Sequence, residues 1–205
     1  MTDDELEREL KESRKIIDSI IHQYEPEEFA ICFNGGKDCT VLLHILLQFK
    51  LRRIKALYIR PVDSFEEIDQ FVFKCAHKYD MDLITIEGHL KQALCQFQND
   101  FPNVKCLFMG TRCTDPHAQK EVCEYTDPDW PKFLRVCPLL NWTYKDIWAY
   151  LLREQIPYCT LYDSGYTSIG TKVNTKPNPC LKTETGFSPA FMLTDGRNER
   201  CGRTK

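Results

Sequence analysis

Two short polar segments, far apart in the chain, carry side chains that suit phosphate chemistry. The first is the loop Asn34-Gly35-Gly36-Lys37-Asp38-Cys39, which separates an apolar run from an amphipathic segment. Its glycines let the backbone approach a ligand closely, and amides at a helix N-terminus favour anions. The second segment holds Arg200 and Arg203, whose guanidinium groups can offer phosphate oxygens a planar fork of donors. Together they predict a nucleotide site, whereas the plainer interpretations are a glycine turn and a solvated tail.

The spacing of the glycines excludes two common phosphate motifs. A Walker loop needs Gly-x-x-x-x-Gly-Lys-Ser/Thr, and a dinucleotide fingerprint needs Gly-x-Gly-x-x-Gly; the loop has neither pattern. It instead resembles the pyrophosphate loop of the ATP pyrophosphatase and PAPS reductase superfamily, whose usual form is Ser-Gly-Gly-x-Asp-Ser. Asn34 and Cys39 replace the two serines of that form, so the subfamily has to be found from other residues.

An alternation of strands and helices is predicted to position the loop. Apolar residues 29–33 predict a strand that ends at the loop, and leucines at helical spacing follow it. Further strands are predicted at 54–59, 83–86 and 104–109, helices at 3–24 and 144–153, and a capping box formed by Ser64 and Glu67 before another helix. This order predicts an α/β fold with a doubly wound, mainly parallel sheet flanked by helices, followed by a loop-rich C-terminal part.

The composition narrows the class of protein. The 205 residues are 42% hydrophobic and carry a formal net charge of −3, so the chain can bury one core and offers no basic footprint for nucleic acid. No apolar run approaches the ~20 residues that span a bilayer, and the acidic start Met1-Thr2-Asp3-Asp4-Glu5 is unlike a signal or transit peptide. We therefore expect a cytoplasmic protein with neither membrane nor nucleic-acid partners. Its eleven cysteines are expected to be reduced, structural thiols.

Four clusters in the second half of the chain narrow the subfamily. They are Met109 to Pro116, Pro138 to Tyr144, Tyr162 to Gly170 with Asn174 to Pro179, and Asn198 to Arg203. Together with the glycine loop, they closely resemble the eukaryotic-type FAD synthetases, which have a PAPS reductase-like fold. We therefore expect one domain over 1–205, with a flanking helix at 1–24, a nucleotide-binding α/β core at 28–110, and flavin-binding and C-terminal catalytic segments at 111–205.

The resemblance implies transfer of AMP from ATP to FMN, giving FAD and pyrophosphate, with Mg²⁺ as cofactor. The implied catalytic residues are Asn34, Asp38, Arg200 and Arg203, and Asp38 would hold magnesium directly or through water. The implied ATP-binding residues are Phe33, Asn34, Gly35, Gly36, Asp38, Tyr58, Arg60 and Gly110. The implied residues for FMN and FAD are Arg112, Asp115, Asp129, Asn141, Trp142, Tyr144, Trp148, Asp163 and Arg200. Small-molecule nucleotides are the expected ligands, and apo-flavoproteins that accept FAD are the expected partners.

Three other functions stay open at this point. A thiol-dependent sulfonucleotide reductase uses the cysteine of a Glu-Cys-Gly-x-His type of motif, but arginine interrupts that pattern in Glu199-Arg200-Cys201-Gly202-Arg203. A tRNA-modifying pyrophosphatase would need a basic stripe. A non-catalytic carrier would bind flavin nucleotides without making FAD.

Several polar residues near the expected site are given plainer roles. Lys37 is expected to face solvent or to be ion-paired, His44 to be a satisfied core histidine, and Cys39 to be the small residue that ends the loop. His117, which follows an Asp-Pro pair, stays a candidate base.

Overall fold

A six-stranded sheet forms the centre of the protein and confirms the predicted α/β class. The computed structural model describes residues 3–51, 53–116 and 118–204. The strands are β1 (Phe29–Cys32), β2 (Lys55–Arg60), β3 (Asp82–Glu87), β4 (Cys106–Phe108), β5 (Cys123–Tyr125) and β6 (Leu134–Val136). Their order is β3-β2-β1-β4-β6-β5, and all neighbours are parallel except β5 with β6. The chain order reverses between β1 and β4, and ligands of open α/β sheets bind at the carboxyl ends of strands beside such a reversal.

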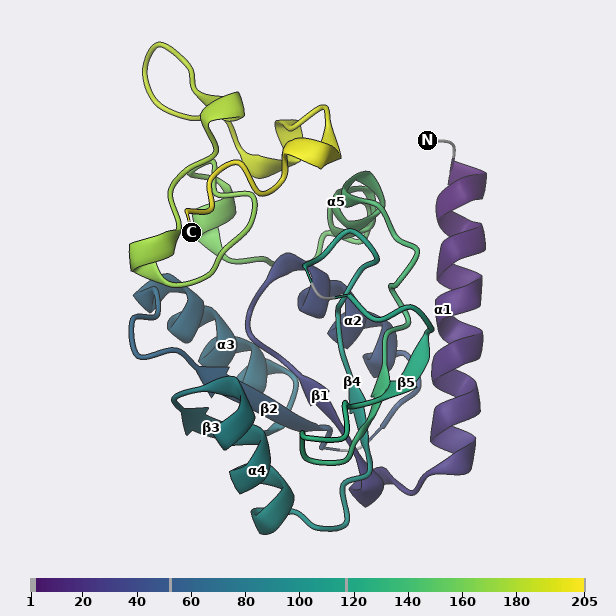
Figure 1. Cartoon of the computed structure of the whole chain (residues 1–205). Helices are drawn as coiled ribbons and strands as arrows, with labels where there is room; N and C mark the ends of the chain where they lie inside the picture. Colours follow the sequence, from purple (N-terminus) through teal and green to yellow (C-terminus); the bar gives the residue numbers. More distant parts are fainter. Residues whose placement is uncertain (1–2, 52, 117, 205) are drawn as a thin grey trace.

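Helices cover both faces of this sheet. The α-helices are α1 (Asp3–Gln23), α2 (Lys37–Leu47), α3 (Glu66–Lys78), α4 (Leu90–Asp100) and α5 (Tyr144–Arg153), and short 3-10 turns occur at Pro26–Glu28, Thr160–Tyr162, Lys172–Asn174, Pro179–Leu181, Ala190–Met192 and Gly196–Asn198. The core residues of α1, α2, α3 and α5 pack on one face, and those of α4 pack on the other. After α5 the chain gathers over one end of the sheet, in light green to yellow in Figure 1.

None of the helices in the described part of the chain is long and apolar enough to cross a lipid bilayer.

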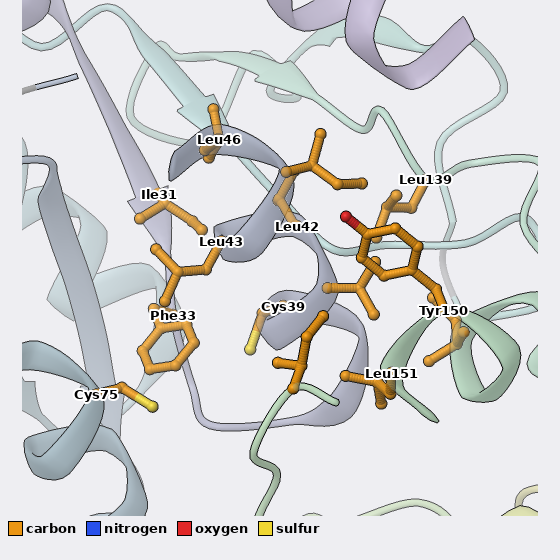
Figure 2. Close-up of a cluster of buried hydrophobic side chains, with 14 of the residues drawn as sticks. Ile31, Phe33, Cys39, Leu42, Leu43, Leu46, Cys75, Leu139, Tyr150 and Leu151 are labelled. Atoms are coloured by element: carbon orange, nitrogen blue, oxygen red, sulfur yellow. The ribbon is translucent and has the colours of Figure 1, made fainter. Parts of the chain in front are cut away.

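Alternating side chains of β1 divide the core between the two faces of the sheet, as expected for a strand. Ile31, and Phe33 just beyond the strand, lie with Leu42 and Leu43 of α2 in the larger cluster (Figure 2). Ala30 lies in the second cluster, on the side of α4. Because most residues of α2 are buried, the loop that leads into this helix has a rigid support.

The predicted capping box at Ser64 and Glu67 is wrong. Helix α3 begins at Glu66, and its N-cap residue is Phe65. The Ser64 hydroxyl donates to Asp69 Oδ1 at 2.8 Å, so it satisfies a buried carboxylate and not the first turn of the helix. The spacing of Ser64 and Glu67 could not reveal this, because the acceptor Asp69 lies on the helix itself and also accepts from Tyr58 of β2.

Ser13 ties α1 to the rest of the domain. Its hydroxyl donates to the backbone oxygen of Pro138 at 2.7 Å and accepts from Trp142 Nε1 at 2.9 Å, in buried surroundings. We expect Ser13→Ala to lower the free energy of unfolding by about 2 kcal/mol, because a buried indole N–H and a buried carbonyl lose their partner. Urea denaturation would measure the change. Ser19→Ala is the matched control, since that hydroxyl is exposed and donates within α1; equal losses in both variants would contradict the prediction.

Candidate active site

A cavity of about 230 Å³ lies at the carboxyl ends of β1 and β4, beside the reversal in chain order. It is lined by Cys32, Asn34, Gly36, Lys37, Asp38, Cys39, Met109, Gly110, Thr111, Asp115, Tyr162, Ser168, Ile169, Glu199, Arg200 and Arg203. A larger cavity of about 470 Å³ lies beside Lys55 and Asp82, which begin β2 and β3. None of the predicted site residues lines that larger cavity. We therefore place the candidate site in the smaller one.

The structure brings seven of the predicted site residues to the wall of this cavity. They are Asn34, Gly36, Asp38, Gly110, Asp115, Arg200 and Arg203. The set includes all four predicted catalytic residues and joins the two polar segments that are far apart in the sequence. Their contacts with ligands stay predictions.

The other predicted ATP-binding residues do not line the cavity. Phe33 and Tyr58 are buried in the core, and the Tyr58 hydroxyl donates to Asp69 at 2.5 Å. Arg60 forms an ion pair with the same carboxylate at 2.8 Å. Gly35 has a φ of 73°, a left-handed conformation that glycine adopts most easily. It therefore shapes the turn of the loop, and ATP contacts by these four residues stay predictions.

The predicted flavin residues do not gather in one place. Trp142, Tyr144 and Trp148 are buried, and so is Arg112, whereas Asn141, Asp129 and Asp163 are exposed. The indole of Trp142 and the hydroxyl of Tyr144 already bond to Ser13 and to the Ala190 carbonyl, while Asp129 pairs with Lys91 and Asp163 accepts from Tyr158. Of this set, Asp115 and Arg200 line the cavity. Flavin contacts by the other residues stay predictions.

The side chain of Asn34 organises the glycine loop. Its Oδ1 accepts from the Gly36 N–H at 2.9 Å and from the Cys39 thiol at 2.9 Å. Because this oxygen is held by two donors and Asn34 lines the cavity, the Nδ2 amide is the part of this side chain that is available to a ligand. The Gly36 amide, which the sequence suggested for phosphate, is thus already used by the loop. The next amide, that of Lys37, donates to the Tyr162 hydroxyl at 2.8 Å.

Four charged side chains form a cluster behind this loop. Asp38 lies 3.0 Å from Lys37 Nζ and 2.6 Å from Arg112 Nε. Glu199 lies 2.5 Å from the same lysine and 2.6 Å from Arg112 Nη2. Each cation is therefore shared between two carboxylates. The lysine and the arginine are also buried, with side chains that are 2% and 1% exposed. Asp115 lies 3.9 Å from Arg112 at the edge of the cluster.

The pKa values of Asp38 and Asp115 are shifted in opposite directions. Burial opposes ionisation of Asp38, but the adjacent charges of Lys37 and Arg112 prevail and lower the pKa of that carboxyl. Burial raises the pKa of Asp115, because Arg112 compensates it less and the other acids repel its charge. Of these two acids, Asp38 is therefore the one that is held in its charged form beside the glycine loop.

The lowered pKa of Asp38 predicts a dependence of stability on pH. Since the folded pKa lies below the unfolded value of 3.8, the ionised carboxylate stabilises the fold above that value and loses this contribution as the pH falls through the folded pKa. We expect the free energy of unfolding to fall more steeply below about pH 4 in the parent protein than in Asp38→Asn. Denaturation at a series of pH values would measure both slopes. Asp127→Asn, at an exposed position, should keep the parent slope, and a parent slope in Asp38→Asn would contradict the prediction.

Arg200 and Arg203 line the cavity and have no acidic partner in the part of the chain that the structure describes. Their Nη1 atoms lie 3.4 and 3.5 Å from the Ser168 hydroxyl, and neither side chain forms an ion pair within residues 3–51, 53–116 and 118–204. Burial and the nearby charge of Arg200 lower the pKa of Arg203. Two neighbouring guanidinium groups that lack a carboxylate suit a ligand with several negative oxygens.

One main contributor to the site, Glu199, was not predicted from the sequence, and the structure describes the roles of Lys37 and His44 more fully. The place of Glu199 next to Arg200 in the chain was the available signal. Lys37 is ion-paired, which was one of the two roles expected for it, but it is also buried. His44, on α2, has its Nδ1 atom 2.9 Å from the Tyr150 hydroxyl, as expected of a satisfied core histidine. His117 lies outside the described residues.

Cys39 has no sign of a nucleophile. Burial raises the pKa of its thiol to about 12, so the thiolate is not formed near neutral pH. The thiol contacts Asn34 Oδ1 and the backbone oxygen of Gly36, which agrees with its expected role as the small residue that ends the loop.

Comparisons with known proteins identify the family. The family model of the phosphoadenosine phosphosulfate reductase domain matches residues 28–100 and 89–177. A protein of Schizosaccharomyces pombe named probable FAD synthase is 41% identical over 211 residues, which cover 97% of this chain and 80% of that protein. The chain belongs to the FAD synthase family.

Members of the FAD synthase family differ in length but share this fold. A probable FAD synthase of Caenorhabditis elegans is 40% identical over 96% of this chain, and the chain spans 40% of that protein. The crystal structure of Candida glabrata FMN adenylyltransferase matches with a TM-score of 0.91 and 26% identity, over 98% of this chain and 88% of that one. The mainly parallel sheet with flanking helices is thus the PAPS reductase-like fold of this family.

Proposed function

We propose that the chain is an FMN adenylyltransferase, which transfers AMP from ATP to the phosphate of FMN and releases pyrophosphate. The observation that carries this proposal is the meeting, in one cavity, of the Asn34 loop with Arg200 and Arg203, two arginines that have no acidic partner among the described residues. The relatives support it, since the Candida glabrata enzyme has been solved with FMN and the ATP analog AMPCPP, and with FAD and inorganic pyrophosphate.

The proposed reaction needs no covalent intermediate with the protein. An oxygen of the FMN phosphate attacks the α-phosphorus of ATP and forms a new P–O bond. The bond from that phosphorus to the oxygen bridging the β-phosphate breaks, and its electron pair leaves with pyrophosphate. The task of the protein is to align two anions and to stabilise the charge that develops on them. Donors from Asn34 Nδ2 and from the two arginines suit that task.

Magnesium is part of the proposal, and the residues present fit it. Asp38 and Asp115 line the cavity, and Mg²⁺ usually takes one or two protein carboxylates together with phosphate oxygens and water. Both oxygens of Asp38 already face cations, from Lys37 and Arg112, which favours contact through water. The described part of the chain has no group of three or more His, Cys, Asp and Glu side chains that could hold an ion, so phosphate oxygens and water would have to supply the other ligands. When bound, magnesium would neutralise charge on the phosphates.

The test is to incubate the purified protein with FMN, ATP and magnesium, and to follow FAD by chromatography and pyrophosphate by a coupled assay. We expect both products in equal amounts, and neither product without magnesium. Binding of both nucleotides without product would favour the non-catalytic carrier, and FAD formation without magnesium would remove the ion from the proposal.

Cys201 does not favour the sulfonucleotide reductase. Although this residue is exposed, partial loss of water around the thiol and the neighbouring Cys180 raise its pKa, whereas nucleophilic thiols have a lowered pKa. Full FAD synthesis by Cys201→Ser would exclude a role for this thiol.

A cytoplasmic location and delivery of FAD to apo-flavoproteins belong to the same proposal, and pull-down of FAD-loaded protein with a purified apo-flavoprotein would test the delivery.

A further inference from the structure

Glu199 joins the C-terminal segment, residues 195–203, to Lys37 at the start of α2 and to Arg112, which follows β4. Its carboxylate accepts two hydrogen bonds from Arg112 Nη2, at 2.7 and 2.6 Å, and one from Lys37 Nζ at 2.5 Å. Both cations are almost completely buried. Removing one partner of a buried ion pair leaves the other charge without compensation, so the position of Glu199 is firmly fixed by the two elements that carry these cations.

The backbone of the same segment is held by a separate set of contacts. The Thr167 hydroxyl donates to the backbone oxygen of Glu199 at 2.6 Å, and the Lys176 N–H donates to the backbone oxygen of Gly202 at 2.9 Å. The guanidinium of Arg203 lies against Gly170, where a Cβ atom would collide with it. The segment is therefore anchored on both sides of Arg200.

We propose that Glu199 is a positioning residue, which sets the direction of Arg200 by fixing the segment that carries this arginine to Lys37 and Arg112. The inference rests on the proposed function, in which the two arginines bind phosphate oxygens. Glu199 is not suited to bind the substrate itself, since its oxygens are taken by two cations and its charge would repel phosphate. It acts through the arginine that follows it in the chain.

The test compares Glu199→Gln, Arg200→Lys and the double variant. We expect Glu199→Gln to lower kcat by about a hundred-fold, the effect of a misplacement of about 1 Å, with the KM for FMN within two-fold of the parent value. Because Glu199 acts through Arg200, the double variant should lose no more than about the larger single loss. A merely structural role would lower the melting temperature but leave kcat per folded molecule unchanged in Glu199→Gln, and that result would overturn the proposal. Two single losses that multiply in the double variant would mean that Glu199 does not act through Arg200, and would also overturn it.

Asp195→Asn is the matched control. It removes another carboxylate of the same segment, one that pairs with the exposed Arg197. We expect this variant to keep kcat within two-fold. A loss equal to that of Glu199→Gln would mean that any disturbance of the segment is enough, and would overturn the specific role of Glu199.

A second variant covers the case in which Glu199→Gln does not fold. Thr167→Val removes the hydroxyl that donates to the Glu199 carbonyl and accepts from Asn178 Nδ2, an amide that also donates to the Asn198 carbonyl. The side-chain partners of Glu199 are unchanged in this variant. It should lower kcat about ten-fold, and an unchanged kcat would count against the proposal.

Binding of inorganic pyrophosphate, measured by calorimetry with magnesium, separates this proposal from the function. If the parent protein makes no FAD but binds pyrophosphate, and Glu199→Gln weakens that binding about ten-fold, the function fails and the positioning role stands. Equal binding by both proteins would overturn the positioning role.

Discussion

Arg203→Ala is expected to lower kcat for FAD synthesis by about a thousand-fold, the scale seen for arginines that stabilise a transferring phosphoryl group. The side chain is partly buried against Gly170 and faces the cavity without an acidic partner in the described part of the chain. It therefore has no ion pair to lose on substitution, and the loss should fall on activity and not on stability. Steady-state FAD formation at saturating FMN and ATP, together with a thermal melt, would measure both.

Two control variants are needed to interpret the result for Arg203→Ala. Arg197→Ala removes a nearby arginine that is exposed and pairs with Asp195 at 2.8 Å, and should keep kcat within two-fold. Arg203→Lys keeps the charge but not the planar fork, and should fall between the parent and the alanine variant. More than a tenth of the parent kcat in Arg203→Ala would contradict the clamp.

Asn34→Asp is expected to lower kcat by about a hundred-fold, comparable with the loss of one donor to a developing oxyanion. The replacement keeps Oδ1, which accepts from Gly36 and Cys39, so the shape of the loop is retained. It exchanges the Nδ2 donor for a negative oxygen that repels phosphate. FAD formation with varied ATP would give both kcat and KM.

Control variants separate the lost donor from the added charge. Asn34→Ser restores the residue usual in related loops and can still accept and donate, so it should keep at least a tenth of the activity. Asn103→Asp adds the same charge at an exposed position and should have no effect. Near-parent kcat in Asn34→Asp would show that Nδ2 does not contact a reacting group.

The sequence predicted the elements that carry strong local patterns. The ends of α5 agree at both residues, and α1 ends one residue before the predicted limit. Helix α4 and strands β5 and β6 were not predicted, because α4 has few buried positions and each of the two strands has three residues, fewer than the usual five or six. The division at residue 110 was not tested, but β5 and β6 add to the sheet beyond it.

The site was predictable where the chemistry is local. The glycine loop and the two arginines could be named because their residue types suit phosphate by themselves. The partner of each buried charge could not, since Lys37 and Glu199 are 162 positions apart and a lysine or glutamate in a sequence carries no mark of burial. The aromatic residues proposed for flavin illustrate the reverse problem. Trp142 and Trp148 are residues of the type that lines a flavin slot, but aromatic residues of the same type also build a hydrophobic core.

The long separation between Lys37 and Glu199 has a consequence for the order in which the protein folds. Synthesis proceeds from the N-terminus and domains form in that direction, so all six strands, which end at Val136, exist before Glu199 has been made. Until then Lys37 and Arg112 have Asp38 and Asp115 as the acids of their cluster, and the cavity has no arginine from the C-terminal segment. The nascent chain can therefore complete its sheet well before it acquires the means to hold a nucleotide.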